Sequence, residues 1–165
     1  MKRNILLLIP AMMFLSGCVF SNSDTSEGSS NNSSKTYGFG DTVTVGDFEY
    51  KVNNASNTKH VGSEYLGADT DNNFVIVNLA VKNVGKSEQD LMGKMMTYHI
   101  GDSEYEPHSG GIYLDNGFYV LQSIGSGISK TIDVLYETPK EFSSSDYLLV
   151  KASSYSSKSA KIYMK

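Results

Sequence analysis

FVIVNLAVK, residues 74–82, is the stretch that decides the fold. Its side chains alternate between two faces: Val75, Val77, Leu79 and Val81 on one, and Ile76, Asn78, Ala80 and Lys82 on the other. A period of two with one apolar face is typical of a half-buried β-strand. Residues 83–86 (NVGK) follow as a turn, since Asn and Gly favour turn conformations. The stretch therefore predicts a strand that packs on the core of a β domain.

Two hairpins flank this strand in the sequence. In the first, residues 41–45 (DTVTV) and 48–52 (FEYKV) are separated by a Gly46-Asp47 turn. In the second, residues 95–100 (MMTYHI) and 104–106 are separated by a Gly101-Asp102 turn. Pro107 ends this hairpin, because proline cannot donate a hydrogen bond to a sheet.

Further strands are expected in the second half of the chain. Asp115-Asn116-Gly117 is a strong turn signal, and we expect it to join strands at 112–114 and 118–121 in a third hairpin. Other strands are predicted at 128–136, 147–152 and 160–164. Helical periodicity is hard to find anywhere. Seven to nine short strands at this spacing predict an all-β fold, an immunoglobulin-like β-sandwich.

The N-terminus has the order of a bacterial lipoprotein signal peptide. Lys2 and Arg3 form a positive region, and residues 5–15 (ILLLIPAMMFL) form an apolar region too short to span a membrane. Leu15, Ser16 and Gly17 then precede Cys18, which matches the lipobox pattern. Because the Cys18 thiol would take a diacylglyceryl group, lipidation also accounts for the lone cysteine; the alternatives are an uncleaved anchor or a buried thiol. We predict a protein held by Cys18 on the extracytoplasmic face of the cell membrane.

The segment after Cys18 has the composition of a spacer. Residues 19–36 read VFSNSDTSEGSSNNSSKT, in which seven Ser and three Asn fill 10 of 18 positions. Such a sequence cannot bury enough apolar surface to offset its ordering entropy. A flexible chain of this length reaches roughly 20–25 Å. We therefore predict a signal peptide at 1–17, a lipidated linker at 18–36 and one folded domain at 37–165.

The net negative charge of the predicted mature chain argues against some classes of binding partner. Without Lys2 and Arg3, 12 basic residues remain against 18 acidic ones, a net charge of −6. This excess argues against nucleic acid or anionic lipid headgroups as partners, since phosphate binding depends on basic residues.

Four stretches together resemble a known family: FGDTVTVGDFEYKVNNAS, FVIVNLAVKNVGKSEQDL, GDSEYEP and GSGISKTIDVLYETPKE. They are similar to a family of bacterial lipoprotein domains of unknown function with a telokin-like or immunoprotective-extracellular-protein-like immunoglobulin sandwich. The resemblance spans most of 37–152, and Asn83-Val84-Gly85 is its most specific piece. Residues 123–127 (SIGSG) replace the usual Pro-Gly-Glu-type turn. The resemblance implies a sandwich and a surface location, and it brings no catalytic residues.

Catalytic and metal-binding signals are sparse. The sequence has no nucleophile elbow, zincin motif, phosphate-binding loop or dinucleotide fingerprint, and the spacing of His60, His99 and His108 selects no triad or zinc site. We expect no cofactor. Asp69, Asp71 and Asn73 place oxygen atoms at alternate positions and could bind Ca²⁺, although Asp and Asn are also common in ordinary turns.

Partner binding is the remaining function class. Tyr113, Phe118 and Tyr119 surround the predicted turn at 115–117 and form an interaction patch if they point outward, or core if they point inward. We expect a non-enzymatic binding module that takes a surface protein first and a small ligand or glycan second. The alternative is a Ca²⁺- or Zn²⁺-dependent binding module, and the third candidate is a hydrolase.

Overall fold

Ten strands and two short 3₁₀ helices make up the part of the chain that the computed structural model describes, residues 36–165. The long strands are β2 (Phe48–Ser63), β3 (Leu66–Asn83) and β8 (Ser129–Thr138). The shorter strands are β1 (Thr42–Val45), β4 (Gln89–Met92), β5 (Met96–Ile100), β6 (Ser103–Tyr105), β7 (Leu121–Ile124), β9 (Tyr147–Lys151) and β10 (Ser159–Tyr163). The helices are η1 (Gly93–Met95) and η2 (Ser109–Tyr113). Ten strands exceed the expected seven to nine, and β4 was not expected.

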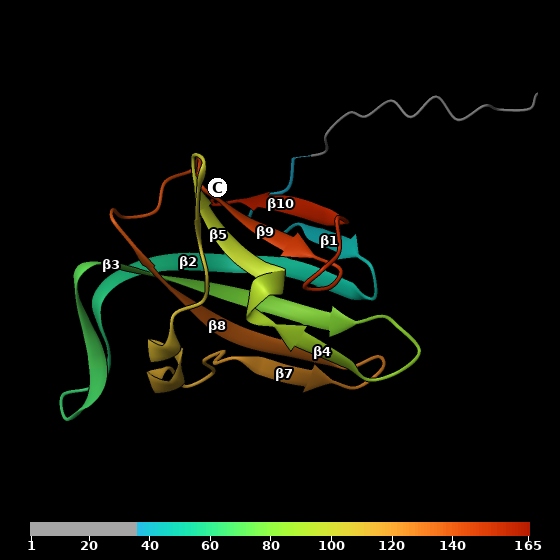
Figure 1. Ribbon diagram of the computed structural model, residues 1–165, viewed down its shortest axis with the longest axis horizontal. Helices are drawn as coiled ribbons and strands as arrows, with labels where there is room; N and C mark the ends of the chain where they lie inside the picture. The colour runs from blue at the N-terminus through green and yellow to red at the C-terminus, as the bar shows by residue number, and fades with distance from the viewer. Residues whose placement is uncertain (1–35) are drawn as a thin grey trace, which may run out of the picture. The chain divides into compact units, whose positions relative to one another are not determined.

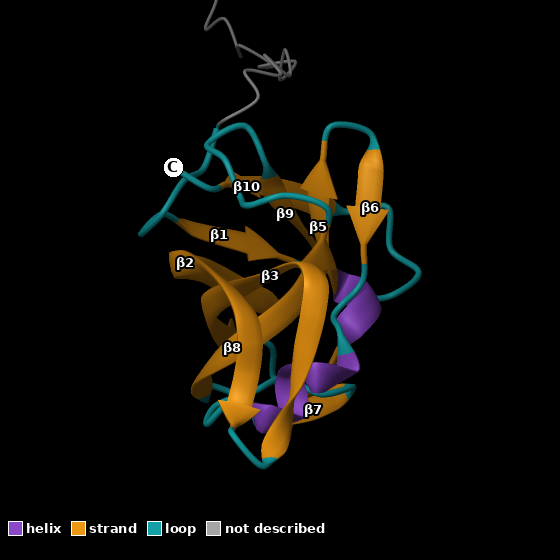
Figure 2. Ribbon diagram, turned by 90° about the vertical axis from the view of Figure 1, so that its left-hand side faces the viewer, coloured by secondary structure: helices purple, strands orange, loops and turns teal. Residues whose placement is uncertain are grey.

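The strands form a β-sandwich. One four-stranded sheet has the order β1-β2-β3-β8 and the other has the order β10-β9-β5-β6, while β4 and β7 form a separate two-stranded sheet. The two larger sheets lie one above the other in Figure 2. All strand pairings inside the three sheets are antiparallel. The predicted all-β sandwich is therefore confirmed.

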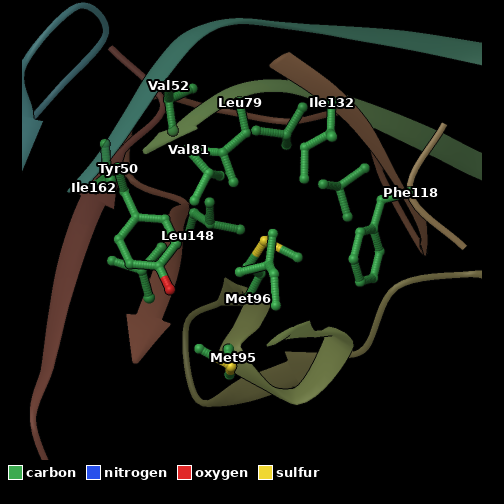
Figure 3. Close-up of a cluster of buried hydrophobic side chains, with 14 of the residues drawn as sticks. Tyr50, Val52, Leu79, Val81, Met95, Met96, Phe118, Ile132, Leu148 and Ile162 are labelled. Atoms are coloured by element: carbon green, nitrogen blue, oxygen red, sulfur yellow. The ribbon is translucent and has the colours of Figure 1, made fainter. Parts of the chain in front are cut away.

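The apolar face of the 74–82 stretch lies in the core. Val75, Val77 and Leu79 have no exposed surface, and Val81 is 1% exposed. They pack with inward residues of the facing sheet, such as Leu148, Met96 and Ile162, as Figure 3 shows for part of the cluster. Burying such side chains contributes about 1.5–3 kcal/mol each, so the apolar face of this stretch contributes substantially to the stability of the fold.

The first two predicted hairpins are confirmed. Strand β1 pairs with β2 from Thr42↔Lys51 to Val45↔Phe48, and β5 pairs with β6. Gly46 and Gly101 in their turns have φ of 63° and 58°. Left-handed backbone of this kind favours glycine, because a Cβ atom makes it strained.

The predicted third hairpin around Asp115-Asn116-Gly117 is wrong. Residues 112–114 lie in and just after η2, and β7 pairs with β4 instead. Two close backbone approaches explain the difference: a Cβ atom on Gly117 would lie 1.7 Å from the Gly111 carbonyl oxygen, and one on Gly111 would lie 2.6 Å from that of Phe118. The glycines thus allow a tight 3₁₀ fold, which the Nδ1 of His108 caps by accepting a hydrogen bond from Gly110 N.

Strands β2 and β3 extend well beyond the expected ends and form a long arm (Figure 1). The arm carries a small second core, in which Val61, Phe74 and Leu135 are buried beneath Tyr113 and Leu114. Its register shifts where Thr58 faces Phe74 and His60 faces Asp69, so residues 70–73 bulge opposite Lys59 alone.

Asn83, at the end of β3, joins three segments. The residue is fully buried. Its Nδ2 donates to the carbonyl oxygens of Ile124 (2.7 Å) and Ser87 (2.8 Å), and its Oδ1 accepts from Gly85 N (2.8 Å). A Cβ atom on Gly85 would lie 2.9 Å from Asp47 Cβ. The Asn83-Val84-Gly85 sequence therefore has a structural role.

Candidate functional site

Three hollows in the described domain share lining side chains. The first, of about 420 Å³, lies between β4, the segment before β7 and the β9–β10 connection. The second and third, of about 450 and 600 Å³, lie around η2 and the arm. Tyr119 lines the first and second hollows, and Ile112 and Tyr113 line the second and third. The hollows therefore form one continuous surface.

This surface gathers most of the exposed large hydrophobic side chains. Ten such side chains occur in residues 36–165, and seven of them line the three hollows. We call these seven the apolar surface: Leu66, Met92, Ile112, Tyr119, Val120, Leu121 and Tyr155. Single exposed apolar residues are ordinary on proteins, whereas a contiguous group marks an interaction site.

Strand alternation explains why part of this surface is exposed. In β4, Leu91 is fully buried while its neighbour Met92 is 40% exposed. Met92 faces Leu121 of β7 across the two-stranded sheet, and Leu121 is 50% exposed. Within residues 36–165 no further sheet covers this outer pair, so the two side chains meet solvent.

Polar groups lie beside the apolar residues. Lys94 and Glu106 line the first hollow and carry opposite charges. Ser154 donates a hydrogen bond to the Met92 sulfur (3.1 Å) and so connects the β9–β10 loop to β4. An apolar centre with a few charged groups around it is the usual composition of a protein-binding surface.

The predicted aromatic patch is only partly correct. Tyr119 is 54% exposed and belongs to the apolar surface. Tyr113 is half-buried, packs on the second core and lines two hollows. Phe118 is 2% exposed and points into the main core (Figure 3), and its backbone N donates a hydrogen bond to the Asp133 oxygen (2.8 Å). Phe118 therefore follows the core alternative and lies outside the apolar surface.

The residues of the candidate Ca²⁺ site lie in β3, at its bulge. The Asp69 carboxylate is 2.8 Å from Nδ1 of His60. The ammonium of Lys59 donates to the carbonyl oxygens of Asp71 and Asn72. Lys59 thus binds main-chain oxygen atoms of the bulge, and of the three proposed ligand side chains Asp69 is the one engaged by a histidine. Among the described residues, no three His, Cys, Asp or Glu side chains cluster closely enough to hold a metal.

Glu137 closes the other side of this bulge. Thr70 Oγ1 and Asn72 Nδ2 both donate hydrogen bonds to its Oε1. These bonds lower the pKa of the Glu137 carboxyl. His108 Nε2 lies 3.8 Å from its other oxygen.

The three histidines lie in separate places. His60 lies on the arm, where the hydrogen bond to Asp69 raises its pKa. His99 stacks on Tyr147, and burial lowers its pKa. His108 packs against Phe74. Within residues 36–165, no hydrogen bond joins a histidine to a serine hydroxyl, so the described residues show no serine–histidine pair of a hydrolase.

Most of the described domain matches the model of a known protein family. Residues 37–162 match the family model described as Domain of unknown function (DUF4352). The chain belongs to this family. No curated protein matches it significantly. The match agrees with the resemblance to lipoprotein domains of unknown function, and it assigns no reaction or ligand.

Solved structures share the fold at low sequence identity. The yjhA protein from Bacillus subtilis is 15% identical, with a TM-score of 0.59, over 79% of this chain and 100% of that one. The candidate lipoprotein ycdA from Bacillus subtilis is 20% identical, with a TM-score of 0.55, over 74% of this chain and 38% of that one. The secreted protein MPT63 from Mycobacterium tuberculosis is 11% identical, with a TM-score of 0.52, over 79% and 97%. Identities this low establish the fold alone.

The predicted signal peptide and lipidation site lie outside the described residues. Leu15, Ser16, Gly17 and Cys18 all precede residue 36. From residue 36 onward, no helix is long and apolar enough to cross a membrane.

Proposed function

We propose that this protein is a lipid-anchored, extracytoplasmic binding module without enzymatic activity, and that it binds another protein through the apolar surface. The observation that carries the proposal is the gathering of seven of ten exposed large hydrophobic side chains along three joined hollows. Leaving these side chains in water is unfavourable, and a partner that covers them gains the free energy of burial.

The lipobox supports the anchored location. Cys18 follows Leu15, Ser16 and Gly17 at the end of the predicted signal peptide. The fold is also found in a candidate lipoprotein and in a secreted protein. Both observations favour a domain at 37–165 that works outside the cytoplasm, held by a linker at 18–36.

The shape of the surface favours a protein over a small ligand. Small molecules bind in concave sites that enclose most of their surface. Here Tyr119, Val120 and Leu121 are each at least half exposed, and Tyr155 is fully exposed. Side chains that project this far contact the broad surface of a protein better than they enclose a small molecule. A glycan or small ligand is therefore the second candidate for the partner.

Cross-linking on living cells tests the proposal. A photoreactive phenylalanine analogue replaces Tyr119 or Tyr155 on the apolar surface, and the same analogue replaces Ile128 as the control. Ile128 is 52% exposed but lines none of the three hollows. We expect one protein to be captured from Tyr119 and Tyr155 and not from Ile128, and to be lost in a secreted Cys18→Ala form. Equal capture from all three positions would contradict a specific surface.

A further inference from the structure

The outer side of strands β9 and β10 carries a group of lysine and tyrosine side chains. Along β9, Leu148 and Val150 are fully buried, and Tyr147 and Lys151 alternate with them on the other side. Along β10, Ile162 is fully buried. We call the outward group the basic face: Tyr147, Lys151, Lys161, Tyr163 and Lys165.

Ring contacts order this basic face. Lys161 Nζ lies 4.3 Å from the centre of the Tyr147 ring, and Lys165 Nζ lies 5.5 Å from that of Tyr163. The two tyrosine rings are 5.5 Å apart. Cation–π contacts hold each ammonium above a ring while its remaining donors stay available. Lysine and tyrosine together suit a membrane–water interface, where the ammonium meets phosphate and the phenol lies at headgroup level.

The local charge is opposite to that of the whole chain. Lys151, Lys161 and Lys165 give the basic face three positive charges, whereas the formal net charge of the chain is −4. Two carboxylates lie nearby: Glu104, 3.8 Å from His99, and Asp41, which accepts from Gly38 N. Charges more than about 8–10 Å away are largely screened at physiological salt. Three ammonium groups beside two carboxylates leave one net positive charge at this face, on a chain that is negative overall.

The chain enters the domain beside this face. Tyr37 forms a parallel bridge with Ile162, and Tyr163 N donates to the Tyr37 oxygen (2.8 Å). Phe39 N donates to the Lys165 oxygen (2.7 Å). In Figure 2 this entry point lies on the side of β9 and β10, and the tip of the β2–β3 arm lies at the opposite end. A flexible chain of 18 residues reaches roughly 20–25 Å, so the predicted anchor at Cys18 would keep the basic face close to the headgroups.

We propose that the basic face docks on the anionic lipid headgroups of the membrane that carries the anchor, and so directs the arm tip away from that membrane. This goes beyond the proposed partner binding and involves other residues. The net charge argues against anionic lipid partners for the chain as a whole, whereas the local charge favours them at this one face.

Lysine labelling on vesicles tests the docking. The mature chain is coupled through Cys18, its only thiol, to maleimide-headgroup lipids in neutral phosphatidylcholine vesicles or in vesicles with about a third phosphatidylglycerol. An amine-acetylating reagent is added, and the labelling rate of each lysine is read by mass spectrometry. Lys82 and Lys86, exposed at the end of β3, are the controls within the same molecule.

We expect labelling of Lys161 and Lys165 to slow at least fivefold on anionic vesicles relative to neutral ones, with Lys82 and Lys86 unchanged and the protection lost in 0.5 M salt. About fivefold corresponds to one lysine's attraction to an anionic surface. In a Lys161→Gln/Lys165→Gln variant the protection of Lys151 should also be lost, whereas a Lys82→Gln/Lys86→Gln variant should retain it. If Lys161 and Lys165 were labelled at the same rate on neutral and anionic vesicles, whether protected on both or on neither, the proposal would be overturned. Neither result bears on the apolar surface, because no protein partner is present.

Discussion

Replacing Asn83 by alanine should destabilise the domain more than any other single change to a polar residue at the end of β3. The side chain is fully buried and makes three hydrogen bonds of 2.7–2.8 Å. Each bond contributes about 0.5–1.5 kcal/mol, and a buried carbonyl left without a donor costs about 1–3 kcal/mol. The Ile124 oxygen is the most buried of the three partners. We therefore expect a loss of about 2–4 kcal/mol.

Urea unfolding followed by circular dichroism measures this loss directly. Asn54→Ala is the matched control, because Asn54 is exposed on β2, and it should change the free energy of unfolding by less than about 0.5 kcal/mol. Asn83→Asp should destabilise at least as much as alanine, since a carboxylate oxygen would face the carbonyl oxygens of Ser87 and Ile124. If Asn83→Ala unfolded at the same urea concentration as Asn54→Ala, the structural role given to this residue would be refuted.

Three further predictions concern the core, the arm and metal binding. Phe118→Ala should lower the free energy of unfolding by about 3–5 kcal/mol, because it empties a core position. Tyr119→Ala should lower it by less than about 1 kcal/mol, because Tyr119 lies on the surface. Comparable losses would contradict the placement of Phe118 in the core and Tyr119 on the surface. Hydrogen bonds from Thr70 and Asn72 lower the Glu137 pKa below its usual 4.5, so their stabilisation is present above that pH and is lost as the pH falls through the folded value. Glu137→Gln should thus be less stable than wild type at pH 7, and the difference should shrink as the pH falls below 4.5 and through the folded-state pKa; a difference in the free energy of unfolding that does not change with pH would show another cause. Lys59 already binds the Asp71 main-chain oxygen, and His60 already binds the Asp69 carboxylate. Millimolar Ca²⁺ or Zn²⁺ should therefore change the melting temperature by less than about 1 °C. A rise in melting temperature that is removed by a chelator and by Asp69→Asn would favour the metal-dependent module.

Much of the sandwich could be predicted because one face of each strand is buried. The alternation in 74–82 and the Gly46 and Gly101 turns correspond to observed strands and turns. Prediction failed where contacts distant in sequence decide the backbone. Asp69–Asn73 resembles a turn by composition, yet pairing with β2 and the Lys59 ammonium hold it as a bulge within β3.

The candidate site was harder to predict than the fold. Of the three aromatic residues proposed from the sequence, only Tyr119 belongs to the apolar surface. Met92, Leu121 and Tyr155 come from β4, β7 and the β9–β10 loop, and each alone is an unremarkable exposed residue. The alternation of buried Leu91 with Met92 was the available signal, and it has meaning only once the partner strand β7 is known.

Binding of the purified mature chain to cells that lack their own copy tests the central claim most directly. Fluorescently labelled wild-type protein is compared with Leu121→Asp on the apolar surface and with Ile128→Asp, an equally exposed position away from it. Loss of a buried leucine contact costs about 1.5–3 kcal/mol, at least a tenfold change in affinity. The account predicts saturable binding that Leu121→Asp weakens at least tenfold and Ile128→Asp leaves unchanged. Binding that is equal for all three proteins, or that never saturates, would contradict the claim that the apolar surface is the binding site.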